Sequence, residues 1–120
     1  MKSLYDHVSI ECSQKITQKY STSFSLGIRL LNIEIRNPIY SIYGFVRLAD
    51  EIVDSFEGYQ QAEMLKNLTR DTYEAIDQKI SINPVLNSFQ KVVHDYNIDQ
   101  SLIQAFLESM EMDLDKQFYS

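Results

Sequence analysis

Apolar side chains recur at intervals of three or four residues along most of this chain, and only three glycines and two prolines interrupt the pattern. This spacing predicts amphipathic helices, because a strand would alternate apolar and polar residues at every second position. No segment alternates in this way. The sequence therefore predicts an all-α fold, and a chain of 120 residues forms one domain at most.

Long helices are expected over about residues 3–20, 38–56, 61–79, 84–96 and from 99 onward, with a short helix within residues 26–36. The two Asn-Pro pairs, at residues 37–38 and 83–84, each fit a helix start with asparagine as N-cap and proline at the first helical position. The side chains expected to face inward, outside the second long helix, are Leu4, Val8, Cys12, Ile16, Leu65, Leu68, Thr72, Ile76, Val85, Phe89, Val92, Val93, Leu102, Phe106, Met110 and Leu114.

Seventeen acidic and eleven basic residues give the chain a net charge of −6. Such a surface repels phosphate backbones, so we expect no nucleic-acid binding, although divalent cations can still bridge an acidic protein to a diphosphate. Cys12 is the only cysteine, which excludes an intrachain disulfide, and the first residues lack the apolar run of a signal peptide. No apolar run approaches the length of a transmembrane helix. A cytoplasmic location is expected.

One stripe along the second long helix carries four polar or amphipathic side chains, Tyr43, Arg47, Asp50 and Asp54. At about 100° per residue they fall within about 60° of one another around the helix axis. An apolar row lies directly beside this stripe and consists of Ile42, Val46, Ala49 and Val53. The two carboxylates are therefore expected at the edge of the buried face rather than on the solvated back of the helix.

This placement of acidic residues is unfavourable for an isolated helix. Like charges at i, i+4 cost roughly 0.2–0.5 kcal/mol, and negative charge near a helix C-terminus opposes the macrodipole by about 0.3–1 kcal/mol. A divalent cation would reverse this balance, because carboxylate oxygens are ligands that Mg²⁺ prefers. The alternative interpretation is a solvated acidic face, and a bare DxxxD spacing does not separate the two.

Three segments together carry a family resemblance. They are YSTSFS at residues 20–25, IYGFVRLADEIVD at residues 42–54 and MEMDL at residues 110–114. The first two, with the distance between them, resemble the opening of squalene and phytoene synthases, where a hydroxyl-rich segment precedes a helix bearing Y-x-x-x-R-x-x-D-(D/E)-x-x-D. The third is similar to a stretch of bacterial phytoene synthases. The resemblance covers nearly the whole chain.

The resemblance implies a class I isoprenoid synthase fold, in which helices surround a deep apolar cavity. It also implies a reaction that joins two prenyl diphosphates head to head with the help of Mg²⁺. The implied site residues are Asp50 and Asp54 as metal ligands, Arg47 as a contact to diphosphate oxygens, Ser21 and Ser23 at the diphosphate end of the pocket, and Tyr43 on its wall. Glu51 stands where aspartate is frequent, and Tyr20 where some relatives have histidine.

The second aspartate-rich motif and the glycine-rich segment of such enzymes are not found in this sequence. The last helix also has no stop signal before Ser120, so we expect an N-terminal portion that is inactive alone, exposes apolar surface and self-associates. Asp113 falls on the inward side of that helix and either approaches the cavity or occupies a boundary position. His7 and His94 lack a second ligand at helical spacing and are expected at the surface.

Four hypotheses of function remain open. The first is a phytoene synthase-like transferase that acts on geranylgeranyl diphosphate. The second is squalene or dehydrosqualene synthesis from farnesyl diphosphate. The third is a non-catalytic helical interaction protein derived from this fold. The fourth is a half-site chain whose second aspartate motif comes from a partner. The resemblance leaves room for peripheral membrane contact of the complete enzyme.

Overall fold

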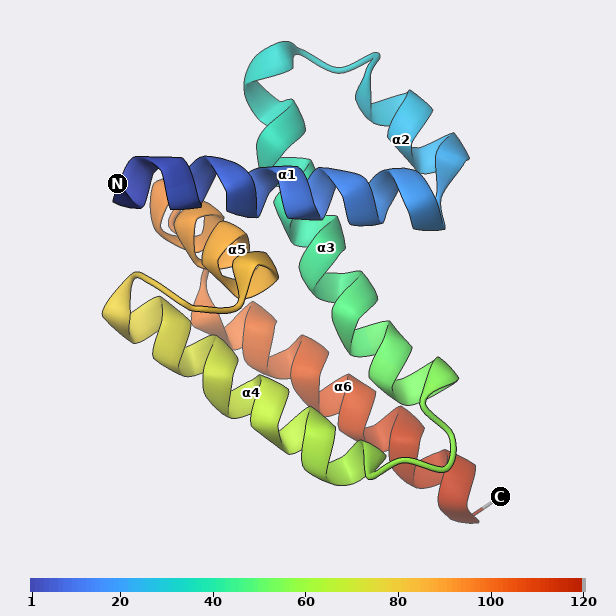
Figure 1. The fold of residues 1–120 in the computed structure, drawn as a ribbon. Helices are drawn as coiled ribbons and strands as arrows, with labels where there is room; N and C mark the ends of the chain where they lie inside the picture. The colour runs from blue at the N-terminus through green and yellow to red at the C-terminus, as the bar shows by residue number, and fades with distance from the viewer. Residues whose placement is uncertain (120) are drawn as a thin grey trace.

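The computed structural model describes residues 1–119, and the side chains of residues 1–117. All regular elements within this range are helices (Figure 1), which confirms the all-α prediction. They are α1 (Lys2–Tyr20), α2 (Thr22–Ile28), α3 (Ile33–Ser55), α4 (Gln61–Gln78), α5 (Pro84–Asp95) and α6 (Gln100–Tyr119). The last helix was predicted to continue through Ser120, which lies outside the described residues. None of the described helices is long and apolar enough to cross a membrane.

Helix α3 is the central element of the fold and packs against α1, α4, α5 and α6. Helix α1 crosses α3 and α5 on one side, while α4 and α6 lie side by side below them (Figure 1). The rings of Phe45 in α3 and Phe89 in α5 stack with centroids 4.0 Å apart at the centre of the core. Burial of this apolar surface is the main stabilising contribution, as in other small domains.

The inward face of α1 differs from the prediction. The buried residues are Ser9, Ser13 and Thr17, whereas Leu4 is 57% exposed and Val8 is 42% exposed. Two of these hydroxyls donate to backbone carbonyls one turn earlier, from Ser9 to Tyr5 and from Thr17 to Ser13, and are thereby satisfied in the interior. A row of small side chains allows two helix backbones to approach closely, which a row of leucines would prevent.

The close approach of α1 and α3 occurs at Gly44. A Cβ atom added at residue 44 would lie 2.9 Å from the Oγ and 3.1 Å from the Cβ of Ser13. Both distances are shorter than ordinary van der Waals contacts. Glycine is therefore required at this position by space, even though it is a poor helix former.

We expect Gly44→Ala to lower the free energy of unfolding by about 1–2 kcal/mol, because the clash with Ser13 outweighs the better helix propensity of alanine. Gly27→Ala is the matched control. Nothing lies within 4 Å of a Cβ at Gly27, so alanine there should stabilise the fold by about 0.5 kcal/mol. Urea unfolding of the two variants measures this difference, and a shift in the same direction for both would contradict it.

The segment between α1 and α3 also differs from the prediction. The short helix covers residues 22–28 and does not include Leu30 or Leu31. It begins at Thr22 because Ser21 caps it by accepting a hydrogen bond from the Phe24 amide at 3.1 Å. Helix α3 begins at Ile33, not at Pro38 with Asn37 as its N-cap, and continues through Pro38. Pro38 is the sixth residue of α3, so it lies inside the helix and removes one intrahelical hydrogen bond there. The turn before it is held by Arg36, which donates to the carbonyls of Leu31 and Arg29.

The remaining boundaries agree closely with the sequence. Asn83 caps α5 by accepting from the amides of Val85 and Leu86, and the Asp99 carboxylate accepts from the Ser101 amide. The inward rows predicted for α4 and α5 are buried. In α6 the prediction is wrong for Leu102, which is 65% exposed, while Ile103 and Leu107 are buried instead.

Candidate functional site

The predicted stripe lies on the C-terminal half of α3, where the end of α1 and the start of α2 approach it. Arg47 is half-buried and pairs with Glu51, one turn further along the same helix. Its guanidinium carbon also lies 4.7 Å from the centre of the Tyr20 ring, in a cation–π contact with the end of α1. These two contacts hold the long side chain in one orientation beside the acidic residues.

Arg47 retains unused capacity to bind an anion. Its Nε atom is buried and has no hydrogen-bond partner among the described residues. Burial would lower the pKa of the guanidinium, but the hydrogen bond and charge of Glu51, with smaller contributions from Asp50 and Tyr43, raise this pKa above its ordinary value. The arginine is therefore a permanent positive charge at the site.

Asp50 and Asp54 differ in their exposure. Asp50 is partly buried on α3, whereas Asp54 is exposed one turn later. Burial raises the pKa of Asp50, and the neighbouring carboxylates of Asp54 and Asp113 raise it further, while Arg47 opposes the shift. Negative charges from α3 and α6 therefore gather at this point. The sequence placed Asp113 on the inward side of its helix, and the structure brings it into the electrostatic range of Asp50, although its side chain is exposed.

The aromatic and hydroxyl residues of the prediction lie at the other end of the stripe. Tyr43 stacks on Phe24 of α2 with ring centroids 5.0 Å apart, which joins α2 to α3. Ser21 is partly buried and acts as the N-cap of α2, and its hydroxyl hydrogen remains available to donate. Ser23 is exposed. Ser21, Tyr43 and Arg47 thus lie where three helices meet, and Ser23 lies on the outer side of α2.

The donor set fits Mg²⁺ only in part. No group of three or more metal-ligating side chains occurs among the residues that the structure describes. Two carboxylates one turn apart nevertheless suit Mg²⁺, which keeps several waters and completes its shell with substrate phosphates. Asp50 and Asp54 would supply the protein's ligands, and any others would come from outside these residues.

Two residues of this arrangement were assigned no role from the sequence alone. Glu51 pairs with Arg47, and the i, i+4 spacing of the two residues already indicated this contact. Hydrogen bonding to Arg47 lowers the pKa of Glu51 below its ordinary value. Tyr20 contacts Arg47 across the α1–α3 interface, which no local pattern could reveal.

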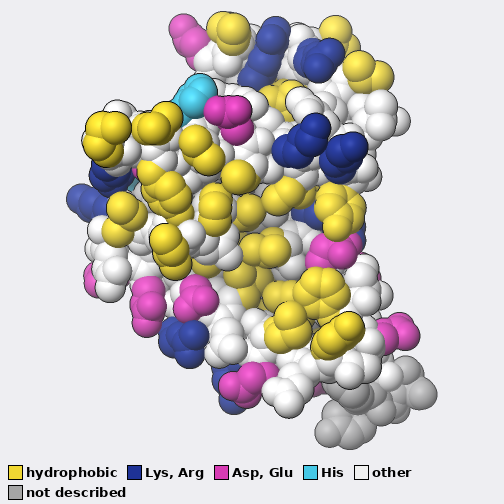
Figure 2. Space-filling view, viewed as in Figure 1, with side chains coloured by type: hydrophobic (Ala, Val, Ile, Leu, Met, Phe, Trp, Pro, Cys, Tyr) yellow, Lys and Arg dark blue, Asp and Glu magenta, His cyan; other side chains and the backbone are white. Residues whose placement is uncertain are grey.

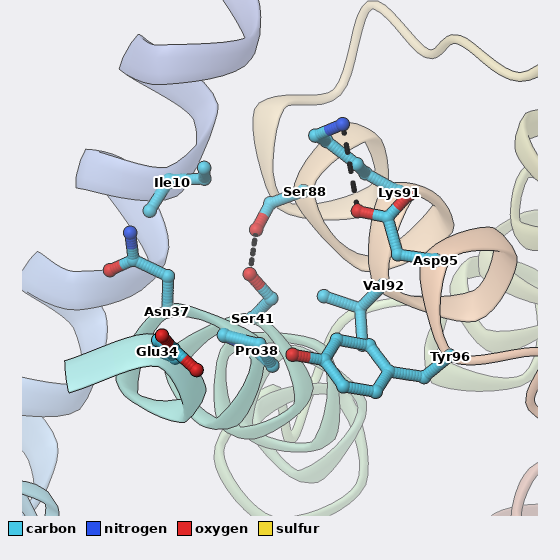
Figure 3. Close-up of a pocket in the computed structure, with 10 residues that line it drawn as sticks. All are labelled: Ile10, Glu34, Asn37, Pro38, Ser41, Ser88, Lys91, Val92, Asp95 and Tyr96. Carbon is cyan, nitrogen blue, oxygen red and sulfur yellow. Dashed lines mark hydrogen bonds and ion pairs between the residues drawn. The ribbon is translucent and has the colours of Figure 1, made fainter. Parts of the chain in front are cut away.

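A hollow of about 210 Å³ lies between α1, α3 and α5, away from the acidic stripe (Figure 3). Ser41 and Ser88 are hydrogen-bonded to each other on its wall, and Lys91 pairs with Asp95 at 3.6 Å. The polar groups that this hollow offers are thus mostly paired with one another. It is not a continuation of the candidate site.

Comparison with known proteins places these observations in a family. The sequence profile of the squalene/phytoene synthases matches residues 17–120, which include α2, the whole acidic stripe and α6. The chain belongs to the squalene/phytoene synthase family. Membership in this family of helical isoprenoid synthases agrees with the all-α fold observed here.

Individual relatives in the squalene/phytoene synthase family carry two different names. The chain is 31% identical to a presqualene diphosphate synthase of Sinorhizobium fredii over 93 residues, which are 78% of this chain and 33% of the relative. It is 24% identical to a phytoene synthase of Cereibacter sphaeroides over 112 residues, covering 87% and 32% of the two chains. It is 27% identical to a chloroplastic phytoene synthase of Narcissus pseudonarcissus over 123 residues, covering 99% and 27%. The chain thus spans about a third of the length of these relatives.

Proposed function

We propose that the complete protein is a Mg²⁺-dependent prenyltransferase that ionises a prenyl diphosphate and joins it head to head to a second one. The single observation that carries the proposal is the cluster on α3, where a fixed arginine and the partly buried Asp50 lie at the edge of the core and the exposed Asp54 follows one turn later on the same side of the helix. Family membership supports the reaction class, since the relatives are prenyltransferase-type synthases.

The role proposed for Arg47 is to bind the leaving diphosphate. A guanidinium offers a planar fork of N–H donors that matches two phosphate oxygens, and its charge persists at every physiological pH. Tyr20 and Glu51 hold this fork in place. Stabilising the negative charge that develops on the leaving group is the contribution expected to be largest for this chemistry.

Asp50 and Asp54 are proposed to hold Mg²⁺ against the diphosphate. The metal would supply positive charge that neutralises the diphosphate as its bond to carbon breaks. Asp50 would be the better-fixed ligand, because it is partly buried and Asp54 is exposed. The stacked rings of Phe24 on α2 and Tyr43 on α3 would offer an aromatic wall to the allylic cation.

One acidic pair does not complete such a site, because ionisation with several metal ions requires ligands on both sides of the diphosphate. The complement is proposed to come from protein outside these 120 residues, either in the same polypeptide or in a partner chain. The identity of the product depends on cavity depth. Geranylgeranyl diphosphate would give phytoene. Farnesyl diphosphate would give dehydrosqualene, or squalene where a hydride donor such as a reduced nicotinamide cofactor is also supplied. The names of the relatives include both branches.

Incubation of the complete protein with Mg²⁺ and either geranylgeranyl or farnesyl diphosphate tests the proposal. We expect release of diphosphate together with a C40 or C30 product, and loss of both when the metal is chelated. Chromatography of the extracted lipids against the two hydrocarbons identifies the chain length. Absence of product from both substrates, with a folded protein and Mg²⁺ present, would refute the prenyltransferase assignment.

A further inference from the structure

Helix α1 is held to the rest of the fold by polar contacts rather than by apolar burial. Among the residues whose side chains the structure describes, the buried apolar cluster at the centre of the fold contains none from α1, and only Ile16 of this helix packs against its edge. The residues that α1 buries are Ser9, Ser13 and Thr17, while Leu4 is exposed. Yellow side chains accordingly lie on the outer side of α1 in the upper part of Figure 2. Helix α1 therefore contributes little to the apolar burial that stabilises the fold.

Hydrogen bonds join the N-terminal half of α1 to α5 and to the loop before it. The side-chain amide of Asn87 donates to the Asp6 carboxylate at 2.9 Å and to the Ser9 hydroxyl at 3.1 Å. The Tyr5 hydroxyl donates to the Ser81 carbonyl at 2.5 Å. Water can replace hydrogen bonds of this kind when two surfaces separate, so each one contributes only modestly to holding α1 in place.

The Ser13 hydroxyl opposes the docking of α1. It is fully buried where α1 approaches Gly44 of α3, and its Oγ atom has no hydrogen-bond partner among the described residues. A buried hydroxyl without a partner is unfavourable, and water would satisfy it if the two helices separated. The small apolar burial of α1 and this hydroxyl both favour a local opening of α1 before the other helices come apart.

The C-terminal end of α1 reaches the candidate site. Ser21 has an extended backbone and is the only residue between α1 and α2, so it forms a joint of one residue. Tyr20 is the last residue of α1, and its ring contacts the Arg47 guanidinium. The pKa of Glu51 is lowered by hydrogen bonding to Arg47 and, to a smaller extent, to Tyr20. A rotation of α1 about Ser21 would therefore turn the Tyr20 ring away from both members of the ion pair.

We propose that α1 opens as a unit about Ser21 while the other helices stay packed, and that its docked position orients Arg47 through Tyr20. Tyr20 is thus a positioning residue for the diphosphate site, and this second step rests on the proposed function. A diphosphate binds an oriented guanidinium fork more tightly than a free one, so its binding stabilises the docked position of α1. The coupling is reciprocal, and opening of α1 weakens diphosphate binding by the same factor.

Hydrogen exchange of the complete protein, measured by mass spectrometry, tests the opening of α1. Without ligand, the amides of α1 are expected to exchange about a hundredfold faster than those of α5. Tyr5→Phe removes one hydroxyl contact and should raise the exchange rate of α1 about fivefold further, with α5 unchanged. Tyr59→Phe is the matched control, since Tyr59 is 74% exposed between α3 and α4, and should leave α1 unchanged. Exchange of α1 at the rate of α5, or an equal effect of the two variants, would overturn the proposal.

Inorganic pyrophosphate with Mg²⁺ tests the coupling of α1 to Arg47. At saturation it should slow the exchange of α1 about fivefold, and Tyr20→Leu should abolish this slowing because the aromatic ring is lost. Tyr20→Phe keeps the ring and should retain the slowing. Tyr96→Leu is the matched control and should also retain it, since Tyr96 is 55% exposed, against 52% for Tyr20, and lies at the end of α5.

Two results would overturn the coupling. Equal slowing in the unmodified protein and in Tyr20→Leu would show that pyrophosphate acts on α1 by another route. No slowing at concentrations where calorimetry shows pyrophosphate bound would show that α1 and the site are independent. Absence of calorimetric binding would refute the proposed function and the coupling with it, while the exchange rates without ligand still decide whether α1 opens. Circular dichroism of every variant establishes that all are equally folded.

Discussion

Asp50→Asn is expected to lower the rate at which the complete enzyme releases diphosphate by roughly a thousandfold. The substitution keeps the size of the side chain and removes its negative charge, so it removes the better-buried of the two proposed metal ligands. The loss should appear mainly in kcat, because the charge is needed most when the carbon–oxygen bond breaks. Steady-state measurement of diphosphate release over a range of Mg²⁺ concentrations gives both constants.

Asp77→Asn provides the matched control for this substitution. Asp77 is exposed on α4, so the same chemical change occurs on a helix without approaching the stripe. Its rate should equal that of the unmodified enzyme. If Asp50→Asn turned over substrate at the unmodified rate, the assignment of Asp50 as a metal ligand would be wrong.

The same substitution should leave the fold intact or slightly more stable. Because the pKa of Asp50 is raised in the folded chain, ionisation of this carboxyl opposes folding at neutral pH. The asparagine side chain of the variant carries no charge, so at neutral pH the variant is expected to gain about 0.5 kcal/mol in its free energy of unfolding. This advantage should shrink as the pH falls through the raised pKa of Asp50 toward the ordinary value for aspartate. Urea unfolding at several pH values measures this difference in stability. It also shows whether the variant loses activity because it is less stably folded.

The sequence predicted those helices best whose inward rows are made of large apolar residues. In α4 and α5 the periodic rows are buried, and the Asn83 cap lies where the Asn-Pro pair indicated. The inward face of α1 was wrong, because hydrophobic periodicity cannot identify a face made of serine and threonine. That face is selected by the space available beside Gly44, which depends on how two helices cross.

The candidate site was predictable to the extent that it lies on one helix. Helical geometry placed Arg47 and Asp50 side by side at the edge of the core, and the structure finds both partly buried there. Tyr20 on α1 contacts Arg47, and the charge of Asp113 on α6 raises the pKa of Asp50. These two interactions link α1 and α6 to the site on α3. Tertiary contacts of this kind carry no periodic signal, so a single sequence does not specify them.

The contacts of Arg47 allow two roles for this residue, and substitutions of Arg47 and Glu51 distinguish them. If Arg47 binds diphosphate, Arg47→Ala should lower kcat/KM of the complete enzyme roughly a hundredfold or more. Arg47→Lys should recover only part of this loss, because lysine keeps the charge but not the planar fork that binds two oxygens. Glu51→Gln should change kcat/KM less than about tenfold, since the guanidinium remains and Tyr20 still orients it.

If Arg47 instead serves only to join two turns of α3, then the ion pair with Glu51 is its whole function. Removing either partner should then have the same effect, and Glu51→Gln and Arg47→Ala should impair the enzyme equally. The ion pair is only half-buried, so its loss alone should lower the free energy of unfolding by no more than about 1 kcal/mol. A loss of two orders of magnitude confined to the arginine variants, at nearly unchanged stability, therefore requires that Arg47 contact the substrate.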